Sequence, residues 1–154
     1  MIPFSQANPP ATLAEINQVE QELGFTFPLS YRNFLLDYNG GTPKKTFFLR
    51  PIINGSDVQE MHVESLSSIS ELMEIWNYFT DAMDFGPDEL DFSQGILFPI
   101  GFNFGGPAIC IGINEAATGK IYVVDGDFGV TFQSNTLDAF LESLADDPYA
   151  DDID

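Results

Sequence analysis

Two apolar runs in the second half of the chain constrain its fold more than any other feature. Residues 108–113 and 121–124 are rich in Ile and Val, and only the short polar stretch 114–119 separates them. A connection this short is typical of a hairpin, so the two runs are expected to pair as antiparallel strands. A third run, 96–101, precedes a Gly-rich turn at 103–107. This part of the chain is therefore predicted to form the centre of a sheet.

Helix signals lie on both sides of this strand-rich region. Thr12 and Glu15 have the spacing of a capping box, and a second helix is predicted to begin near Pro28 and to end at 39–41. Ser68 and Glu71 form another capping box. A last helix, capped at residue 135 or 136, has apolar residues at 137, 140, 141 and 144. That spacing predicts an amphipathic helix that packs one face against the core.

Weaker strand signals occur at 46–50, 58–63 and 130–132. Helices placed around a run of hairpins favour an α+β fold, here with a mainly antiparallel sheet of about five or six strands and with helices at its face and ends. The chain contains no repeat and no long linker, so residues 1–154 are expected to form one domain. Residues 1–10 are predicted to be an extended lead-in, and 146–154 an acidic tail.

The charge is strongly unbalanced. Five Lys and Arg residues stand against 24 Asp and Glu residues, which gives a net charge of −19. Direct binding to nucleic acid or to an anionic membrane requires the opposite sign. Three causes of the acidity remain open: general solubility, adaptation to high salt, and an acidic face that steers association with a basic protein.

The chain shows no targeting segment and no apolar stretch near the ~20 residues that cross a bilayer. Its single cysteine, Cys110, lies in an apolar run and is expected to be a buried small hydrophobe. A chain without an internal disulfide is typical of a reducing compartment, so a cytoplasmic location is expected.

Short fragments of the chain resemble catalytic motifs, but each lacks residues that the motif requires. Residues 118–120 (Thr-Gly-Lys) resemble the end of a phosphate-binding loop, but Ile121 stands where its Ser or Thr should be. Residues 127–129 match the Asp-Phe-Gly triplet of kinases, but the chain has neither the catalytic-loop motif nor the glycine-rich loop of a kinase.

His62 is the only histidine and Cys110 the only cysteine, too few for a structural zinc site of the usual Cys/His type. Asp125 and Asp127 could hold a cation only weakly. We therefore expect a binding protein that uses no cofactor and no metal, rather than an enzyme.

Two segments, taken in order, carry a resemblance to a known family. The first holds a helix–Gly–Phe-x-Phe-Pro–helix–Asn-Gly-Gly pattern and the second a Pro-Ile-Gly pattern followed by Gly-Gly and a Tyr strand. The residues of these motifs are Leu23, Gly24, Pro28, Tyr31, Phe34, Leu35, Asn39, Gly40, Gly41, Pro99, Gly101, Gly105, Gly106 and Tyr122. In this order and spacing, the chain resembles the SUKH superfamily, which includes the fungal cell-wall-assembly regulators of the Smi/Knr type.

The resemblance implies an α+β domain and a binding role. Bacterial members are mostly immunity proteins that neutralise the toxin domain, often a nuclease, of a polymorphic or contact-dependent toxin system. The alternative is a regulatory or scaffold module of the Smi/Knr type. The chain departs from the family pattern at Pro107 and at Asp125-Gly126, so those positions are not carried over as contacts. The resemblance leaves the toxin unnamed and the oligomeric state open.

Acidic residues after the third helix are the first candidates for contact with a basic partner: Asp81, Asp84, Asp88, Glu89 and Asp91. Asp125 and Asp127 come second. The alternative for both groups is an acidic surface that is merely solvated.

Overall fold

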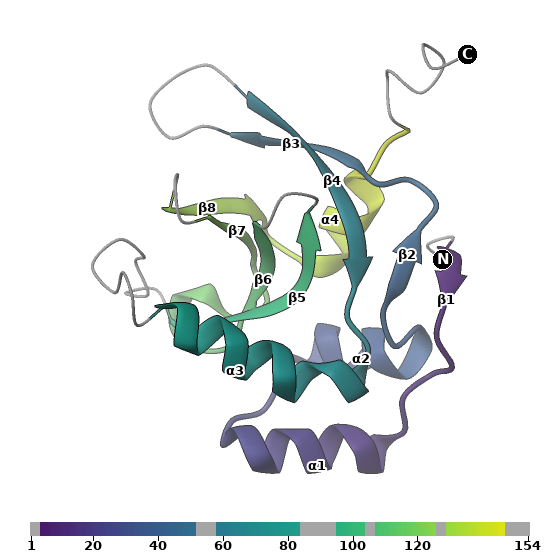
Figure 1. The fold of residues 1–154 in the computed structure, drawn as a ribbon, viewed down its shortest axis with the longest axis vertical. Helices are drawn as coiled ribbons and strands as arrows, with labels where there is room; N and C mark the ends of the chain where they lie inside the picture. Colours follow the sequence, from purple (N-terminus) through teal and green to yellow (C-terminus); the bar gives the residue numbers. More distant parts are fainter. Residues whose placement is uncertain (1–3, 52–57, 84–94, 104–106, 126–128, 147–154) are drawn as a thin grey trace.

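The computed structural model describes residues 4–51, 58–83, 95–103, 107–125 and 129–146 (Figure 1). These residues form α-helices, strands and two short 3₁₀ helices, η1 and η2. In chain order they are β1 (Phe4–Ala7), α1 (Leu13–Leu23), α2 (Leu29–Asp37), β2 (Gly41–Pro43), β3 (Phe47–Pro51), β4 (Val58–Leu66), η1 (Ile69–Glu71), α3 (Leu72–Met83), β5 (Leu97–Asn103), β6 (Ala108–Gly112), η2 (Glu115–Ala117), β7 (Ile121–Asp125), β8 (Gly129–Ser134) and α4 (Leu137–Ser143).

The strands form one antiparallel sheet in the order β1-β2-β4-β5-β6-β7-β8, with β3 paired to β4 beside this path. The hairpins predicted from the apolar runs are confirmed, because β5, β6 and β7 are neighbours. The described sheet has eight strands instead of five or six. The lead-in is extended, as expected, but its residues 4–7 pair with β2 and so belong to the sheet.

β4 divides its pairing between two parts of the sheet. Its first half pairs with β3, and its last residues pair with β2 and β5. The β3–β4 hairpin also contacts β8 through side chains. Arg50, only 1% exposed, donates from Nε and Nη2 to Thr131 Oγ1 at 3.1 and 2.8 Å. Gln133 Nε2 donates to the Leu49 carbonyl at 2.8 Å. These bonds tie the hairpin to the last strand.

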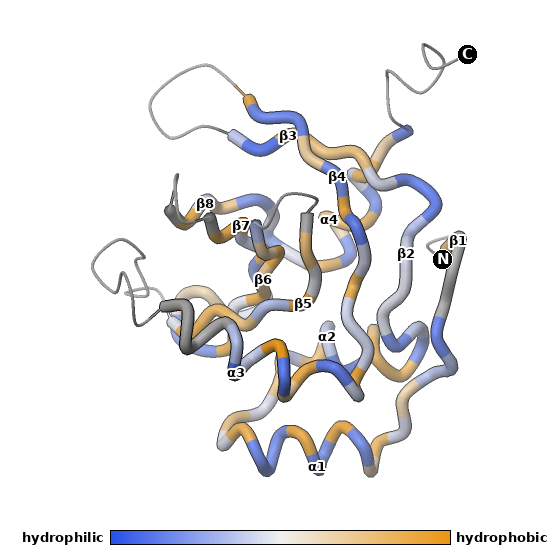
Figure 2. The backbone as a smooth tube through the Cα atoms, viewed as in Figure 1, coloured by the Kyte–Doolittle hydropathy of each residue, from blue (hydrophilic) through white to orange (hydrophobic). Residues whose placement is uncertain are grey.

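The core lies between the helices and one face of the sheet. Alternation along β6 and β7 explains why: Ile109, Ile111 and Val123 point to the helical side and are fully buried. Cys110 points to the other face, in a smaller apolar cluster with Tyr122. Figure 2 shows hydrophobic and hydrophilic residues alternating around the turns of α1, which buries one side of that helix.

The predicted helix signals are confirmed in detail. The Thr12–Glu15 and Ser68–Glu71 capping boxes are both formed, and Thr136 caps α4. Gly24 ends α1 in the left-handed conformation with φ 86°. The third helix differs from the prediction in one respect, because its first turn is η1 and the α-helical part starts at Leu72. No helix among the described residues is both long and apolar enough to cross a membrane.

A buried carboxylate fixes the turn between α1 and α2. Glu20 is 7% exposed. Its Oε2 accepts a hydrogen bond of 2.6 Å from the Phe27 backbone N–H and lies 3.5 Å from Arg32 Nε. Arg32 Nη2 also donates to Asn17 Oδ1 at 3.1 Å. The carboxylate therefore holds the start of α2 against α1.

Replacing Glu20 with alanine is expected to destabilise the fold by ~1–3 kcal/mol, because the buried Phe27 N–H loses its acceptor. Glu20→Gln keeps an acceptor oxygen and should lose less. Urea denaturation followed by circular dichroism measures both free energies of unfolding. Equal losses in the two variants would show that the charge, rather than the hydrogen bond to Phe27, stabilises the turn.

The junction after α2 is held by several hydrogen bonds of one residue, Asn39. Asn39, with φ 53°, adopts the left-handed conformation, as does Gly40 with φ 81°. The Asn39 side chain accepts from the Ile69 N–H at 2.7 Å and donates to the Pro9 carbonyl at 3.0 Å. Its own carbonyl accepts from Asn8 Nδ2 at 3.0 Å. One residue thus joins the end of α2, the segment after β1 and the start of η1.

Candidate protein-binding surfaces

Most of the acidic residues predicted to contact a partner lie outside the described residues. This applies to Asp84, Asp88, Glu89, Asp91 and Asp127. The structure places the backbones of the other two on separate elements. The prediction that Asp81 follows the third helix is wrong, because α3 continues to Met83 and includes this residue. Asp125 is the final residue of β7.

The family-motif residues within the described structure support the fold. Tyr31, Phe34 and Leu35 are buried in the main core, and Gly105 and Gly106 lie outside the described residues. The buried residues Pro99 and Gly101 flank a register shift where β5 meets β6, and Tyr122 is buried on β7. Leu23 and Pro28 flank the turn between α1 and α2 and are partly exposed.

Gly101 explains a close approach between two strands. A Cβ at this position would lie 2.7 Å from both a Leu66 methyl carbon and the Ser65 carbonyl oxygen. Glycine is therefore needed where β5 passes β4. The motif is a packing motif here, which agrees with its composition of glycine, proline and aromatic residues.

The described residues contain no group of three or more His, Cys, Asp and Glu side chains arranged to hold a metal ion. Cys110 is fully buried, as expected from the sequence. Burial raises the pKa of its thiol, so the nucleophilic thiolate is disfavoured. His62 lies on β4 with Nδ1 3.2 Å from Thr46 Oγ1 and with its ring against Phe47. Both of these contacts are with residues of the β3–β4 hairpin or of the segment that leads into it.

A groove between α2 and α4 carries three carboxylates. It has a volume of about 330 Å³. Asp37 contributes from the end of α2, and Asp138 and Glu142 contribute from one face of α4. The other described residues of the lining are Ser30, Asn33, Phe34, Tyr38 and Leu141, so no cationic side chain among the described residues lines the groove. We call this surface the acidic groove.

The sequence predicts only part of the acidic groove, namely the pair of carboxylates on α4. Asp138 and Glu142 are four residues apart, which predicts that they share a helix face. Asp37 lies about a hundred residues earlier, and its proximity follows from the packing of α2 on α4. The predicted contact residues were instead those that cluster along the chain.

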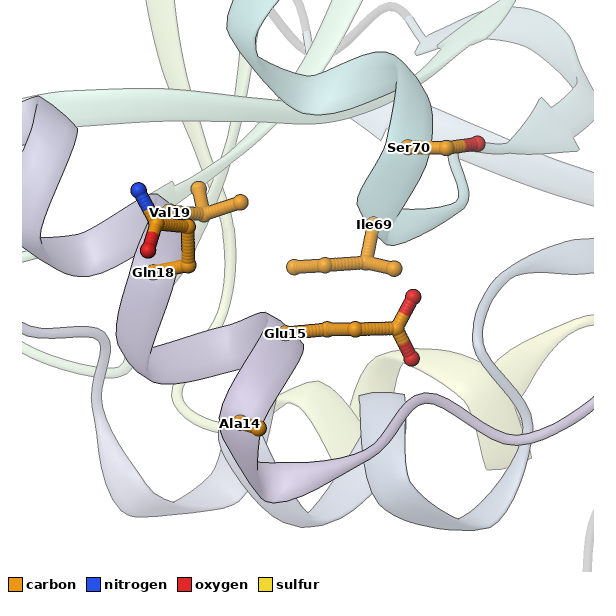
Figure 3. Close-up of a pocket in the computed structure, with 6 residues that line it drawn as sticks. All are labelled: Ala14, Glu15, Gln18, Val19, Ile69 and Ser70. Carbon is orange, nitrogen blue, oxygen red and sulfur yellow. The ribbon is translucent and has the colours of Figure 1, made fainter.

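A second groove, between α1 and η1, is lined mainly by apolar groups (Figure 3). It is shallow, with a volume of about 360 Å³. Ala14 and Val19 of α1 and Ile69 of η1 form its apolar surface, and Glu15, Gln18 and Ser70 complete the lining. Figure 3 shows the Ile69 side chain projecting from η1 toward α1, between Val19 and Glu15. We call this surface the α1–η1 groove.

The cationic residues are unevenly distributed over the elements. Arg32, Lys44, Lys45, Arg50 and Lys120 are the five in the chain. None of them belongs to α1, η1, α3 or α4, so these helices carry only negative charge. A surface with one sign of charge attracts partners of the opposite sign and excludes like-charged ones.

Comparison with known proteins identifies one family. A search of curated proteins found no match for this chain. The SMI1/KNR4 family (SUKH-1) matches residues 10–143, which is most of the chain and includes every described helix. The four helices and the antiparallel sheet agree with the α+β fold that the resemblance implied. The chain belongs to the SMI1/KNR4 family, SUKH-1.

Proposed function

We propose that this protein is an immunity protein that binds and neutralises a cognate toxin domain, such as a nuclease, through contacts between its carboxylates and cationic groups of the toxin. The observation that carries the proposal is the acidic groove, in a member of the SUKH-1 family with a net charge of −19. The proposed role is binding without catalysis, in the cytoplasm, where the toxin would act on the producing cell.

Electrostatics supports this choice of partner. A nuclease presents Lys and Arg side chains to phosphates, and an inhibitor that covers them gains from opposite charge. Close interfacial charge pairs contribute ~1.5–7 kcal/mol of coupling, and steering raises association rates toward ~10⁸–10⁹ M⁻¹s⁻¹ at low salt. Both effects weaken as ionic strength rises, because mobile ions screen the charges.

The first test is the identity of the neighbouring gene. The reading frame next to the gene should encode a long protein with a C-terminal toxin domain, and co-expression should protect cells from that domain. Replacing Asp37, Asp138 and Glu142 together by lysine should weaken binding by at least about a hundredfold, or ~2.7 kcal/mol, and should flatten the salt dependence. Calorimetric titration with the toxin domain measures both effects.

Two further variants locate the interface. The triple reversal of Asp84, Asp88 and Glu89 to lysine tests the acidic residues predicted from the sequence. Reversal of the exposed residues Glu60, Glu64 and Glu115 to lysine makes the same change in charge on β4 and η2, at positions that do not line the acidic groove, and serves as the control. If all three variants bind equally, net charge alone matters and the acidic groove is not the contact site. If the protein binds a housekeeping protein in a pull-down and does not neutralise the neighbouring toxin, its role is that of a regulatory module instead.

A further inference from the structure

We propose that the α1–η1 groove is a docking site for a basic amphipathic segment of a protein partner. In this arrangement an apolar side chain of the segment enters the groove, and its cationic side chains pair with the carboxylates around it. Among the residues that the structure describes, the α1–η1 groove and the acidic groove share no lining residue. The inference therefore does not depend on toxin neutralisation.

The shape and lining of the groove suit a side chain. Its volume of about 360 Å³ is near the lower end of the ~300–1,000 Å³ typical of small-molecule sites. Its floor is made of Val19 and Ile69, and the exposed Ala14 opens one side to solvent. A shallow apolar hollow between two helices gains free energy when it receives an apolar side chain, because both surfaces leave water.

Carboxylates surround this apolar floor. Glu15 lines the groove itself. Glu22 lies one helical turn beyond Gln18, which donates to it at 3.0 Å, and Glu74 lies one turn beyond Ser70. All three carboxylates are on exposed residues. Because α1, η1 and α3 contain no Lys or Arg, a segment with positive charge complements the exposed carboxylates of these helices.

The Glu15 carboxylate is already held in place before any partner binds. Its Oε1 accepts from the Thr12 N–H at 2.9 Å and from Thr12 Oγ1 at 3.0 Å. The same arrangement holds the Glu71 carboxylate, which accepts from the N–H and Oγ of Ser68 at 3.0 Å each. A carboxylate fixed in this way loses little conformational entropy when a cation pairs with its second oxygen.

An exposed aromatic side chain extends the surface. Tyr78, one turn beyond Glu74 on α3, is 73% exposed. Figure 1 shows α1 and α3 lying side by side at one end of the molecule. Exposed aromatic and apolar residues beside carboxylates are typical of contacts with a polypeptide rather than with a small ligand.

A peptide titration tests the inference on the intact protein. The probe is a synthetic peptide with leucines at helical spacing and lysines elsewhere; serines replace the leucines in a second peptide of equal charge. The amide NMR signals of residues 13–22 and 69–74 should shift with the leucine peptide. This peptide should bind at least about tenfold more tightly than the serine peptide, which corresponds to ~1.4 kcal/mol.

Variants separate the groove from general acidity. Ala14→Phe fills the groove and should weaken binding of the leucine peptide about tenfold, or ~1.4 kcal/mol. Ala139→Phe adds the same side chain at an exposed position of α4 and should change binding less than about twofold, or ~0.4 kcal/mol. If Ala14→Phe lowers the melting temperature, the double variant Glu22→Gln/Glu74→Gln replaces it, with weaker binding and a smaller salt dependence expected.

Three results would overturn the proposal. The first is equal affinity for the leucine and serine peptides, and the second is a set of NMR shifts confined to α2 and α4. The third is unaltered binding of the leucine peptide to Ala14→Phe, or to Glu22→Gln/Glu74→Gln where that variant replaces it. If the free protein dimerises and Ala14→Phe abolishes this dimerisation, the groove binds a second copy of the chain instead. Loss of peptide binding with intact toxin neutralisation, or the reverse, distinguishes this inference from the proposed function.

Discussion

Replacing Gly40 with alanine is expected to destabilise this protein by about 2–5 kcal/mol. A Cβ at this position would lie 2.5 Å from the carbonyl oxygens of both Leu66 and Ser67. Relieving the overlap requires movement of backbone at the end of β4, and such overpacking costs ~1–3 kcal/mol. The φ of 81° adds the left-handed strain of a residue with a Cβ, ~1–2 kcal/mol. The free energy of unfolding from urea denaturation measures the sum.

Gly24→Ala is the matched control for this variant. Gly24 has nearly the same φ, 86°, but a Cβ there would meet no atom within 4 Å. This variant should therefore show only the left-handed strain of ~1–2 kcal/mol. Equal losses at the two positions would contradict the packing argument, because the contact with Leu66 and Ser67 would then contribute nothing.

Asn39→Ala is expected to cost about 2–4 kcal/mol. The substitution leaves the Ile69 N–H without its acceptor and the Pro9 carbonyl without its donor, and an unsatisfied buried group costs ~1–3 kcal/mol. It also places a residue with a poor left-handed propensity at φ 53°. Thermal unfolding should show a lower melting temperature, by ~2–4 °C for each kcal/mol in a chain of this size.

Two other substitutions at Asn39 separate the contributions of its two side-chain hydrogen bonds and of the backbone strain to stability. Asn39→Asp keeps the acceptor for the Ile69 N–H and the tolerance for positive φ, but cannot donate to the Pro9 carbonyl. Asn39→Gly removes both side-chain hydrogen bonds and relaxes the backbone. If the aspartate variant is as unstable as the alanine variant, the bond to Pro9 is the important one. A fully stable glycine variant would mean that neither bond matters.

The sequence predicted those parts of the fold that depend on neighbouring residues. The capping boxes and the Thr136 cap each involve residues at most a few positions apart. The hairpin between β6 and β7 follows from two adjacent apolar runs. In each of these cases the physical cause lies within one window of the sequence.

The parts that sequence reasoning missed depend on distant partners. Phe4–Ala7 has no alternation that marks a strand, and it becomes one because β2 presents an edge to it. The acidic groove joins Asp37 to Asp138 across the packing of two helices. Acidic residues that cluster along the chain are visible in a sequence, whereas those brought together by packing are not.

The buried side chain of Arg50 has a consequence for synthesis on the ribosome. Its hydrogen-bond acceptor on β8, Thr131, lies 81 residues further along the chain. At ~5–20 residues per second, roughly 4–16 s pass between the synthesis of the arginine and that of its acceptor. During that interval the bond to Thr131 cannot form, so the Arg50 side chain reaches its native set of hydrogen bonds only after the last strand has been made.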